Sequence, residues 1–303
     1  MSNTITVHHP AVRTAALLYS VFKLRIGFSI MLCTLAGAAI TPGPGPGVWN
    51  LLLLAFAVLA SSAAAGAFNQ LVERDLDGRM QRTKDRPFVT GEFHPGWHWL
   101  VAIAVLLTGS AALAIHAANL VSAAYVFLGA FTYGVVYTVW LKRRSVWNIV
   151  VGGLAGSFAV LAGAAAVDPT PTGAPVLLAL VLFLWTPPHF WSLAFAARDD
   201  YRRAGVPMLP CTVSARTAAW VVLAHTATLV LIAPFGFLLG LGWIYLTGAV
   251  VGGALFLTAS IRFVQRPDRK RAMANFFASL AQLTLLLVGA MLEGWLAGGA
   301  SGW

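Results

Sequence analysis

Nine long apolar segments divide this sequence, and they restrict its fold more than any other feature. A helix needs about 20 mostly apolar residues to cross the hydrocarbon core of a bilayer. Because backbone polar groups inside a bilayer must be satisfied within the segment, the pattern predicts an all-α integral membrane protein with nine transmembrane helices. The segments are residues 15–41, 48–72, 97–117, 119–141, 146–167, 173–197, 217–240, 242–262 and 275–296.

Two pairs of these segments are separated by only a short break. Asn119 divides the third from the fourth, and the run from Gly240 to Gly242 divides the seventh from the eighth. An unbroken helix of about 40 residues far exceeds the thickness of a bilayer. We therefore predict a tight hairpin at each break.

The composition excludes most soluble classes. Charged residues make up 10% of the chain and hydrophobic residues 59%, whereas a soluble domain has about 25% charged residues. Such a chain cannot cover a water-facing surface, so a soluble enzyme or a disordered regulator is not expected. Its two cysteines, Cys33 and Cys211, support no disulfide framework.

The basic residues indicate the topology. All 20 Lys and Arg residues precede or lie in the first segment, or follow the second, fourth, sixth and eighth. The positive-inside rule then places the N-terminus in the cytoplasm and the C-terminus outside. The net charge of +10 is thus interpreted as inner loops facing anionic lipid, with no nucleic-acid partner. No cleavable signal is recognised, and a bacterial plasma membrane is the simplest location.

Acidic residues gather in two cytoplasmic places, of which the first follows the second segment. Asn69, Glu73 and Asp77 are spaced four residues apart, so on a continuing helix their oxygens share one face. Asp75 would face elsewhere, and Gly78 is a plausible terminator. Converging oxygen ligands suit Mg²⁺, which commonly also binds phosphates. An ordinary loop of mixed charge is the alternative.

Several basic groups are placed to contact such phosphates. Arginine grips phosphate oxygens directly. Lys23 and Arg25 lie inside the first segment, where they either extend to the headgroups or face an interior cavity that holds anions. Tyr137 and the run from Lys142 to Arg144 either mark topology or close the mouth of a phosphate site. The candidate diphosphate-binding residues are Lys23, Arg25, Arg82, Lys84, Arg86, Tyr137, Lys142 and Arg143.

The second acidic place ends the sixth segment. Pro187 and Pro188 are expected to kink that helix and free backbone carbonyls. His189 follows the kink, and Asp200 lies 11 residues on, so on one helix both would share a face; Asp199 would point about 100° away. A hydrogen-bonded structural histidine is one interpretation, and a cavity-lining histidine is the other.

Two carboxylate clusters at one end of an apolar bundle suggest how a substrate binds. We expect a central apolar cavity, open at the cytoplasmic side, with a diphosphate at its mouth and a hydrocarbon tail inside. These are the features of a prenyl diphosphate. The expected chemistry is ionisation of its allylic C–O bond, with Mg²⁺ and cationic side chains stabilising the leaving diphosphate and a dry cavity shielding the carbocation.

The motifs resemble the intramembrane aromatic prenyltransferases, the superfamily of 4-hydroxybenzoate polyprenyltransferase, and more narrowly the haem O synthases, or protohaem IX farnesyltransferases. Two departures concern helix bending. The family usually has Lys-Pro-Arg where this chain has Lys23-Leu24-Arg25, and a proline pair within 157–160. The resemblance is carried by Asn69, Glu73 and Asp77, by residues 80–87, 137–143, 148–153 and 185–191, and by residues 199–201 and 205–210.

The resemblance implies a single prenyltransferase domain over residues 1–303. Its activity would be transfer of the farnesyl group of farnesyl diphosphate to a vinyl group of haem b, with addition of water, giving haem O and diphosphate. The lipid bilayer is a further expected partner, and whether a haem A synthase or a terminal oxidase docks here is left open by the sequence. By resemblance His189 handles haem, and Arg82, Arg86, Lys142 and Arg143 bind diphosphate. Metal and catalytic roles fall on Asn69, Glu73, Asp77, Asp199 and Asp200.

Three other functions remain open on the sequence. A prenyltransferase of the same fold could act on a quinone precursor or a chlorin. A nine-span transporter needs polar or broken-helix features towards both sides, and the outer half of this chain has few. A haem-delivery factor would need no Mg²⁺ site.

Overall fold

The computed structural model describes residues 10–298, and every regular element in that range is a helix. The predicted all-α class is therefore confirmed for this part of the chain. In chain order the elements are α1 (Pro10–Val21), α2 (Leu24–Ala39), α3 (Val48–Val72), α4 (Arg74–Asp77), α5 (Pro87–Thr90), α6 (Trp97–Ala117), α7 (Leu120–Phe131), η1 (Thr132–Leu141), α8 (Asn148–Gly152), α9 (Leu154–Val167), α10 (Ala174–Ala196), α11 (Arg198–Arg203), α12 (Leu209–Thr212), α13 (Ala215–Ile232), η2 (Ala233–Leu239), α14 (Trp243–Gln265) and α15 (Arg269–Gly298).

Within residues 10–298, eight helices are long and apolar enough to cross a membrane, and the bent pair of α1 and α2 makes a ninth if it is counted as one span. The ends of the eight agree with the predicted segments to within three residues, except that the last helix begins at Arg269, six residues before the predicted segment 275–296. Both predicted hairpins are present. Asn119 has extended backbone and caps α7 by accepting a hydrogen bond from the Ser122 amide. Gly240 follows η2 with a φ of 94°, a conformation that favours glycine.

The first span is not the continuous helix expected for 15–41. It breaks at Phe22 and Lys23, and α1 and α2 meet at 53°. Lys23 has a φ of 48°, the one positive φ of a non-glycine residue in the described range. Leu24 begins α2 at the position where the family usually has proline, so the bend forms here without a proline. The left-handed conformation costs roughly 1–2 kcal/mol, which contacts of the Lys23 side chain must offset.

Two other expected helices end earlier than the motif spacing assumed. α3 ends at Val72, and α4 is a separate turn. α10 ends at Ala196 and α11 begins at Arg198. The helix face predicted to be shared by His189 and Asp200 therefore does not exist as such. Asn69, Glu73 and Asp77, by contrast, remain linked across the break by hydrogen bonds from the Glu73 amide to the Asn69 carbonyl and from the Asp77 amide to the Glu73 carbonyl. Conversely, α10 continues through its proline pair as one helix.

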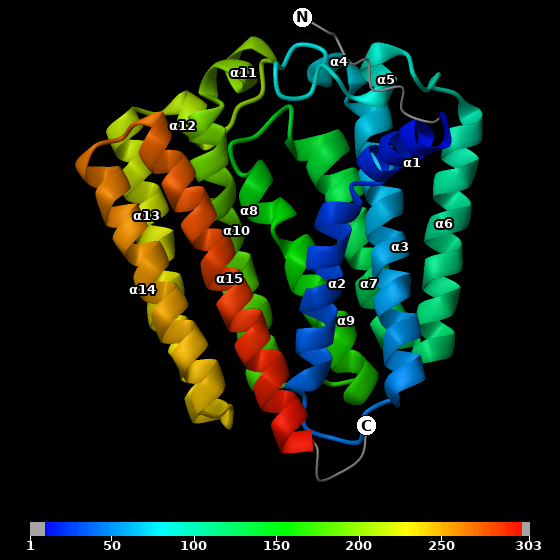
Figure 1. The fold of residues 1–303 in the computed structure, drawn as a ribbon, viewed down its shortest axis with the longest axis vertical. Coiled ribbons are helices and arrows are strands. Elements are labelled where there is room, and N and C mark those ends of the chain that lie inside the picture. Colours follow the sequence, from blue (N-terminus) through cyan, green and yellow to red (C-terminus); the bar gives the residue numbers. More distant parts are fainter. Residues whose placement is uncertain (1–9, 299–303) are drawn as a thin grey trace, which may run out of the picture.

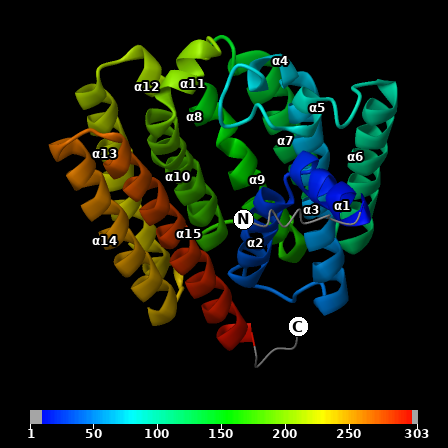
Figure 2. The same ribbon diagram turned by 45° about the horizontal axis from the view of Figure 1, so that its top comes forward.

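The short helices and the polar loops gather at one end of the bundle. Figures 1 and 2 show α4, α5, α11 and α12 at this end, together with α1, whereas α15 ends at the opposite end. The long helices form two groups: α2, α3, α6, α7 and η1 with α9 come from the N-terminal half, and α10, α13, α14 and α15 from the C-terminal half. We call the end that carries the short helices the polar end.

Small residues allow these helices to approach closely. A Cβ placed on Gly163 would lie 1.8 Å from the carbonyl oxygen of Thr34, so α9 and α2 are in backbone contact. A Cβ on Gly294 would lie 2.0 Å from the carbonyl oxygen of Ala39, which joins α15 to α2 near the end opposite the polar end. Close packing at small residues is a general source of helix association in membranes.

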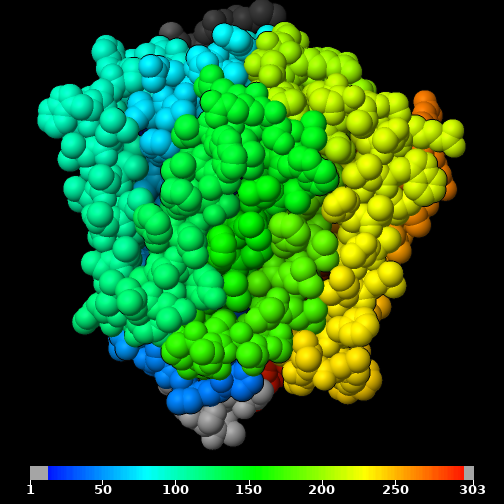
Figure 3. Space-filling view, turned by 180° about the vertical axis from the view of Figure 1, so that it is seen from behind, coloured from blue at the N-terminus to red at the C-terminus, as the bar shows by residue number. Residues whose placement is uncertain are grey.

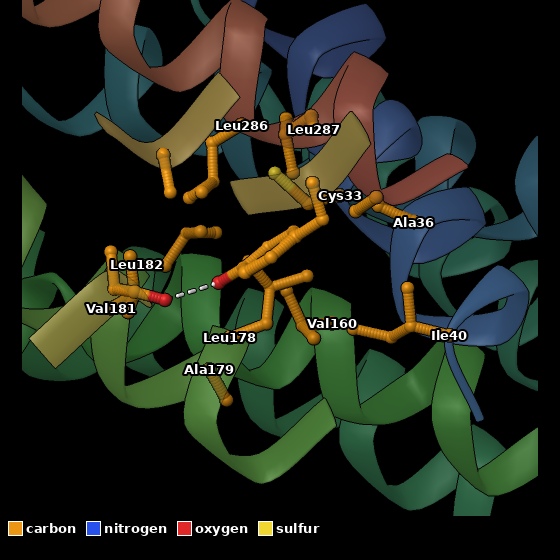
Figure 4. Close-up of a cluster of buried hydrophobic side chains, with 14 of the residues drawn as sticks. Cys33, Ala36, Ile40, Val160, Leu178, Ala179, Val181, Leu182, Leu286 and Leu287 are labelled. Carbon is orange, nitrogen blue, oxygen red and sulfur yellow. Dashed lines mark hydrogen bonds between the residues drawn. The ribbon is translucent and has the colours of Figure 1, made fainter. Parts of the chain in front are cut away.

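A buried apolar cluster joins the two halves of the bundle (Figure 4). It draws Cys33 from α2, Val160 from α9, Leu178 and Leu182 from α10, and Leu286 from α15. Figure 3 shows the molecule from behind, with the middle of the chain between the helices of the N-terminal half and those of the C-terminal half. Many large hydrophobic side chains are exposed on the outward faces of the bundle. Large hydrophobic side chains such as Trp49 and Leu238 are among those most exposed, which suits an integral membrane protein whose outer faces contact lipid.

Candidate active site

The first acidic motif is buried at the polar end, and each member contacts a cation from another part of the chain. Asn69, Glu73 and Asp77 are 1%, 0% and 2% exposed. The Lys23 ammonium donates to Oδ1 of Asn69, and the Lys142 ammonium donates to Oε2 of Glu73. Arg86 donates to Oδ2 of Asp77 at 2.6 Å.

This mutual pairing follows from the cost of burying charge. A buried carboxylate or ammonium must be paired or hydrogen-bonded, or it loses several kcal/mol of solvation. Burial lowers the pKa of the Lys142 ammonium, while the adjacent Glu73 carboxylate acts in the opposite direction. The pairing is nevertheless incomplete, since Oε1 of Glu73 is buried and has no hydrogen-bond partner.

The oxygen atoms of these three side chains fit a hard divalent cation that also binds water and phosphate. Asn69, Glu73 and Asp77 offer only oxygens, which Mg²⁺ prefers, and Oε1 of Glu73 is left over. Within residues 10–298 no group of three or more His, Cys, Asp or Glu side chains could hold a metal ion alone. Mg²⁺ characteristically uses one or two carboxylates and completes its shell with water and substrate phosphate, so this residue set fits it.

The second acidic motif adjoins the loop that follows the first. Oδ2 of Asp200 accepts a hydrogen bond from the Arg82 amide at 3.2 Å, and Oδ1 pairs with Arg203. The Arg82 guanidinium also donates to the phenol oxygen of Tyr201 at 3.3 Å, and burial raises the pKa of that phenol. The structure therefore brings the two motifs to the same end of the bundle. Asp199 is exposed.

The π-helix η1 supplies two residues, Tyr133 and Thr138, that were not predicted as site residues. Asn69 donates from Nδ2 to Thr138 Oγ1 at 2.8 Å, and Thr138 donates to the Tyr133 carbonyl at 2.8 Å. The Tyr133 hydroxyl accepts from the Lys23 ammonium at 3.1 Å. η1 has π-helical hydrogen bonding, a form found frequently at functional sites. Tyr133 and Thr138 are polar groups inside a span, and this was the available signal.

Two predicted residues, Tyr137 and Lys142, lie beside the buried Glu73. The Tyr137 ring is buried and stacks on Tyr133 with centroids 5.5 Å apart. The Lys142 ammonium lies 5.6 Å from the centre of the Tyr137 ring, within the range of a cation–π contact. These contacts hold the ammonium next to Glu73.

Three other predicted residues lie at the surface. Arg143 bonds Asp75 through both guanidinium nitrogens, at 2.8 and 2.9 Å, and holds the pKa of that carboxyl below its ordinary value. Asp75 faces away from the buried acids, as expected. Arg25 and Lys84 are exposed, and the structure does not bring their side chains into the buried cluster.

An apolar cavity begins beside the buried acids. Lys23 and Tyr133 line it, and both belong to the cluster around Asn69. Its empty space is about 600 Å³, including an open part. The helices around this cavity all come from the N-terminal half. The remaining lining is mostly apolar or small, including Ile26, Ile30, Val58, Ser61, Ala65, Val126, Ala155 and Ala159.

His189 belongs to another part of the bundle. It lies on α10, and its side chain contacts α15: Nδ1 is 2.7 Å from Oγ of Ser279. Its ring stacks between Trp185 and Phe276. The structure therefore separates His189 from Asp200, with which it was expected to share a helix face.

Comparison with known proteins identifies the family and several relatives of this chain. The family described as UbiA prenyltransferases matches residues 30–286. The chain is 55% identical to "Protoheme IX farnesyltransferase 2" of Paramagnetospirillum magneticum over 93% of this chain and 98% of the relative. It is 39% identical to "Protoheme IX farnesyltransferase" of Granulibacter bethesdensis over 86% and 82%.

Solved structures support the fold alone. A digeranylgeranylglyceryl phosphate synthase superposes with a TM-score of 0.75 at 16% identity, covering 93% of this chain and 99% of the other. A UbiA homologue from Archaeoglobus fulgidus bound to GPP and Mg²⁺ superposes with a TM-score of 0.67 at 17% identity, covering 91% and 99%.

Proposed function

This chain belongs to the UbiA prenyltransferase family, and we infer that it is a protohaem IX farnesyltransferase. The enzyme transfers the farnesyl group of farnesyl diphosphate to a vinyl group of haem b and adds water, which gives haem O and diphosphate. Relatives with this name are 38–55% identical to the chain over most of its length.

One observation carries the chemistry: a buried cluster of acids and cations stands at the start of an apolar cavity. Lys23 contacts Asn69 and also lines the cavity, so a ligand that reaches both must be charged at one end and apolar along the rest. A prenyl diphosphate has this form. The apolar walls take the hydrocarbon chain, since burial of each CH₂ group contributes about 0.8 kcal/mol.

The residues around the diphosphate divide into two roles. Lys23, Arg86 and Lys142 are the cations in contact with Asn69, Asp77 and Glu73 respectively. We assign them, with Arg82 and Tyr137, to the diphosphate. Lys84, Arg25 and Arg143 lie at the surface and are assigned to its approach. Asn69, Glu73 and Asp77, with Asp199 and Asp200 of the second motif, would hold Mg²⁺. When bound, Mg²⁺ neutralises charge on the leaving diphosphate.

In the reaction the allylic C–O bond breaks and its electron pair stays on the diphosphate oxygen. Cations fixed in advance at the developing charge lower the barrier, because they need not reorganise as the bond breaks. The farnesyl cation then accepts the π electrons of a haem vinyl group. The cation formed on haem takes up water, which loses a proton. Apolar walls around the first cation delay its capture by water.

The location follows from the placement of charge. We place the polar end at the cytoplasmic face of a bacterial plasma membrane, with the N-terminus inside and the C-terminus outside, because the basic loops belong to this end. Farnesyl diphosphate, whose head is strongly charged, then binds from the cytoplasm, while its chain and haem b occupy the depth of the bilayer.

Acceptor identity is tested by supplying each acceptor to one preparation. The chain is purified in detergent with Mg²⁺ and farnesyl diphosphate, and either haem b or 4-hydroxybenzoate is added. We expect haem O, identified by chromatography and mass, and no prenylated benzoate. An Asp77→Asn protein serves as the matched control without turnover. Prenylated benzoate without haem O would overturn the assignment of the acceptor but leave prenyl transfer intact.

A further inference from the structure

The side chain of His189 is held by three groups, two on α15 and one on α10. Its ring stacks on Trp185 at a centroid distance of 4.1 Å and an interplanar angle of 17°. On the other face it stacks on Phe276 at 4.5 Å and 26°. In the plane of the ring, Nδ1 is 2.7 Å from Oγ of Ser279. The orientation of the ring is therefore fixed on both faces and at one edge.

The contacts of Ser279 bear on which nitrogen of His189 carries the proton. Oγ of Ser279 lies 2.6 Å from the Phe276 carbonyl oxygen, to which its hydroxyl can donate, and 2.7 Å from Nδ1 of His189. With the one hydroxyl hydrogen donated to the carbonyl, Oγ accepts from Nδ1–H, and Nε2 then carries the lone pair.

Nε2 is left open by its surroundings. Among the hydrogen bonds of the described residues, none involves this atom, and it is not one of the buried polar atoms that lack a partner. His189 itself is partly exposed. The ring is therefore held on both faces and at Nδ1, while Nε2 has no hydrogen-bond partner among the described residues.

Ser279 also holds one of the flanking rings. Its carbonyl oxygen accepts a hydrogen bond from Nε1 of Trp185 at 2.9 Å, and the residue is completely buried. One residue of α15 thus contacts both Nδ1 of His189 and the indole that covers its ring.

We propose that Ser279 is a positioning residue that presents Nε2 of His189 as an axial ligand to the iron of the haem acceptor. The neutral imidazole is a common metal ligand, and which nitrogen binds is set by the hydrogen bond at the other. A partner at Nδ1 fixes the ring and raises the basicity of the coordinating nitrogen. This proposal rests on the proposed function, since it requires an iron porphyrin as acceptor.

The coordination is tested by haem spectroscopy on the purified full-length chain without farnesyl diphosphate. Ferric and ferrous haem b are titrated into wild type, His189→Ala, Ser279→Ala and Ser279→Thr, and the Soret band and the electron paramagnetic resonance spectrum report the axial ligand. Iron-free protoporphyrin IX is titrated in parallel, because it fills the same space without a metal. Ser260→Ala is the matched control, since Ser260 is also buried but bonds Thr226 and Asn275.

We expect a nitrogen-ligand spectrum in wild type and its loss in His189→Ala, with recovery on addition of imidazole. Loss of a hydrogen bond behind a metal ligand weakens metal binding about 10–100-fold, so Ser279→Ala is expected to bind haem at least about 10-fold more weakly. Ser279→Thr keeps the hydroxyl and should restore most of this loss. Affinity for protoporphyrin IX is expected to be the same in all these proteins, as is haem binding by Ser260→Ala.

Two results would overturn the proposal in distinguishable ways. If His189→Ala or Ser279→Ala has the haem spectrum and affinity of wild type, iron coordination by His189 is wrong while haem O synthesis stands. If wild type neither binds haem nor forms haem O, the proposed function is wrong and this inference falls with it. Tryptophan fluorescence shows whether each variant is folded. If His189→Ala or Ser279→Ala is unfolded, His189→Gly is used in its place, and its haem spectrum is compared with and without added imidazole.

Discussion

The buried pair of Lys142 and Glu73 allows a quantitative prediction. Glu73 is fully buried, Lys142 is 8% exposed, and Oε1 of Glu73 already lacks a partner. Lys142→Met removes the cation paired with Glu73. Breaking a buried pair from one side costs about 3–5 kcal/mol, because the remaining charge is uncompensated. For a chain of this size the loss corresponds to a fall of roughly 10 °C in the unfolding temperature.

A second substitution tests whether the loss comes from the unpaired carboxylate. Glu73→Gln in the same protein removes the charge that Lys142→Met leaves behind. Replacing both members of a buried pair by neutral groups is often nearly neutral, so the double variant is expected to regain more than half of the lost stability. Thermal unfolding is followed by tryptophan fluorescence in one detergent, without substrate or metal. Lys270→Met, at an exposed lysine, is the control and should shift the midpoint little.

The cycle has a clear contrary outcome. The cycle also includes Glu73→Gln alone. If the loss of stability in the double variant equals the sum of the losses in the two single variants, the side chains are not coupled and the buried pair does not contribute as argued. Haem O formation is a separate measurement. It is expected to be lost in all variants that lack Lys142 or Glu73, because the first binds diphosphate and the second metal in the proposed mechanism.

Three further predictions address the metal, the cavity and the far end of the bundle. Chelation of divalent metal should abolish turnover, Mg²⁺ should restore it in wild type, and Asp77→Asn should remain at least about 100-fold slower at saturating Mg²⁺, by haem O assay; full activity in chelator would contradict the metal role. Ala159→Phe fills part of the cavity, so the KM for farnesyl diphosphate should rise more than the KM for the shorter geranyl diphosphate. Equal changes in the two KM values would mean that the prenyl tail does not bind in this cavity. Glu293 accepts hydrogen bonds from the amides of Ile244 and Tyr245 at 2.9 and 3.2 Å and so caps α14. Glu293→Ala should lower stability by about 0.5–2 kcal/mol with turnover unchanged per folded molecule, and unchanged thermal unfolding would refute the cap.

Much of the fold could be predicted from local pattern. The bilayer leaves few solutions for a long apolar segment, because its backbone must be satisfied within the helix. For the same reason Asn119 and Gly240 were recognisable as breaks. The first span was the exception. Its bend at Lys23 depends on where the ammonium is bonded, on Asn69 and Tyr133, and those residues are distant in sequence.

The acids of the site could also be found from the sequence, but their partners could not. The spacing of Asn69, Glu73 and Asp77 after an apolar segment led us to predict Glu73 and Asp77 as site residues. The cation paired with Glu73 comes from 69 positions further along the chain. The serine hydroxyl that contacts Nδ1 of His189 lies 90 positions further along the chain. No periodicity connects residues at such separations.

The sequence by itself determined which segments enter the membrane, where they turn, and which residue types are available for diphosphate chemistry, because these depend on neighbours within a few turns. The tertiary structure decided that Lys23 meets Asn69 and Lys142 meets Glu73, that Ser279 contacts Nδ1 of His189, and that Glu293 caps another helix. These outcomes depend on how the helices pack, since helix packing sets which distant side chains come within hydrogen-bonding distance.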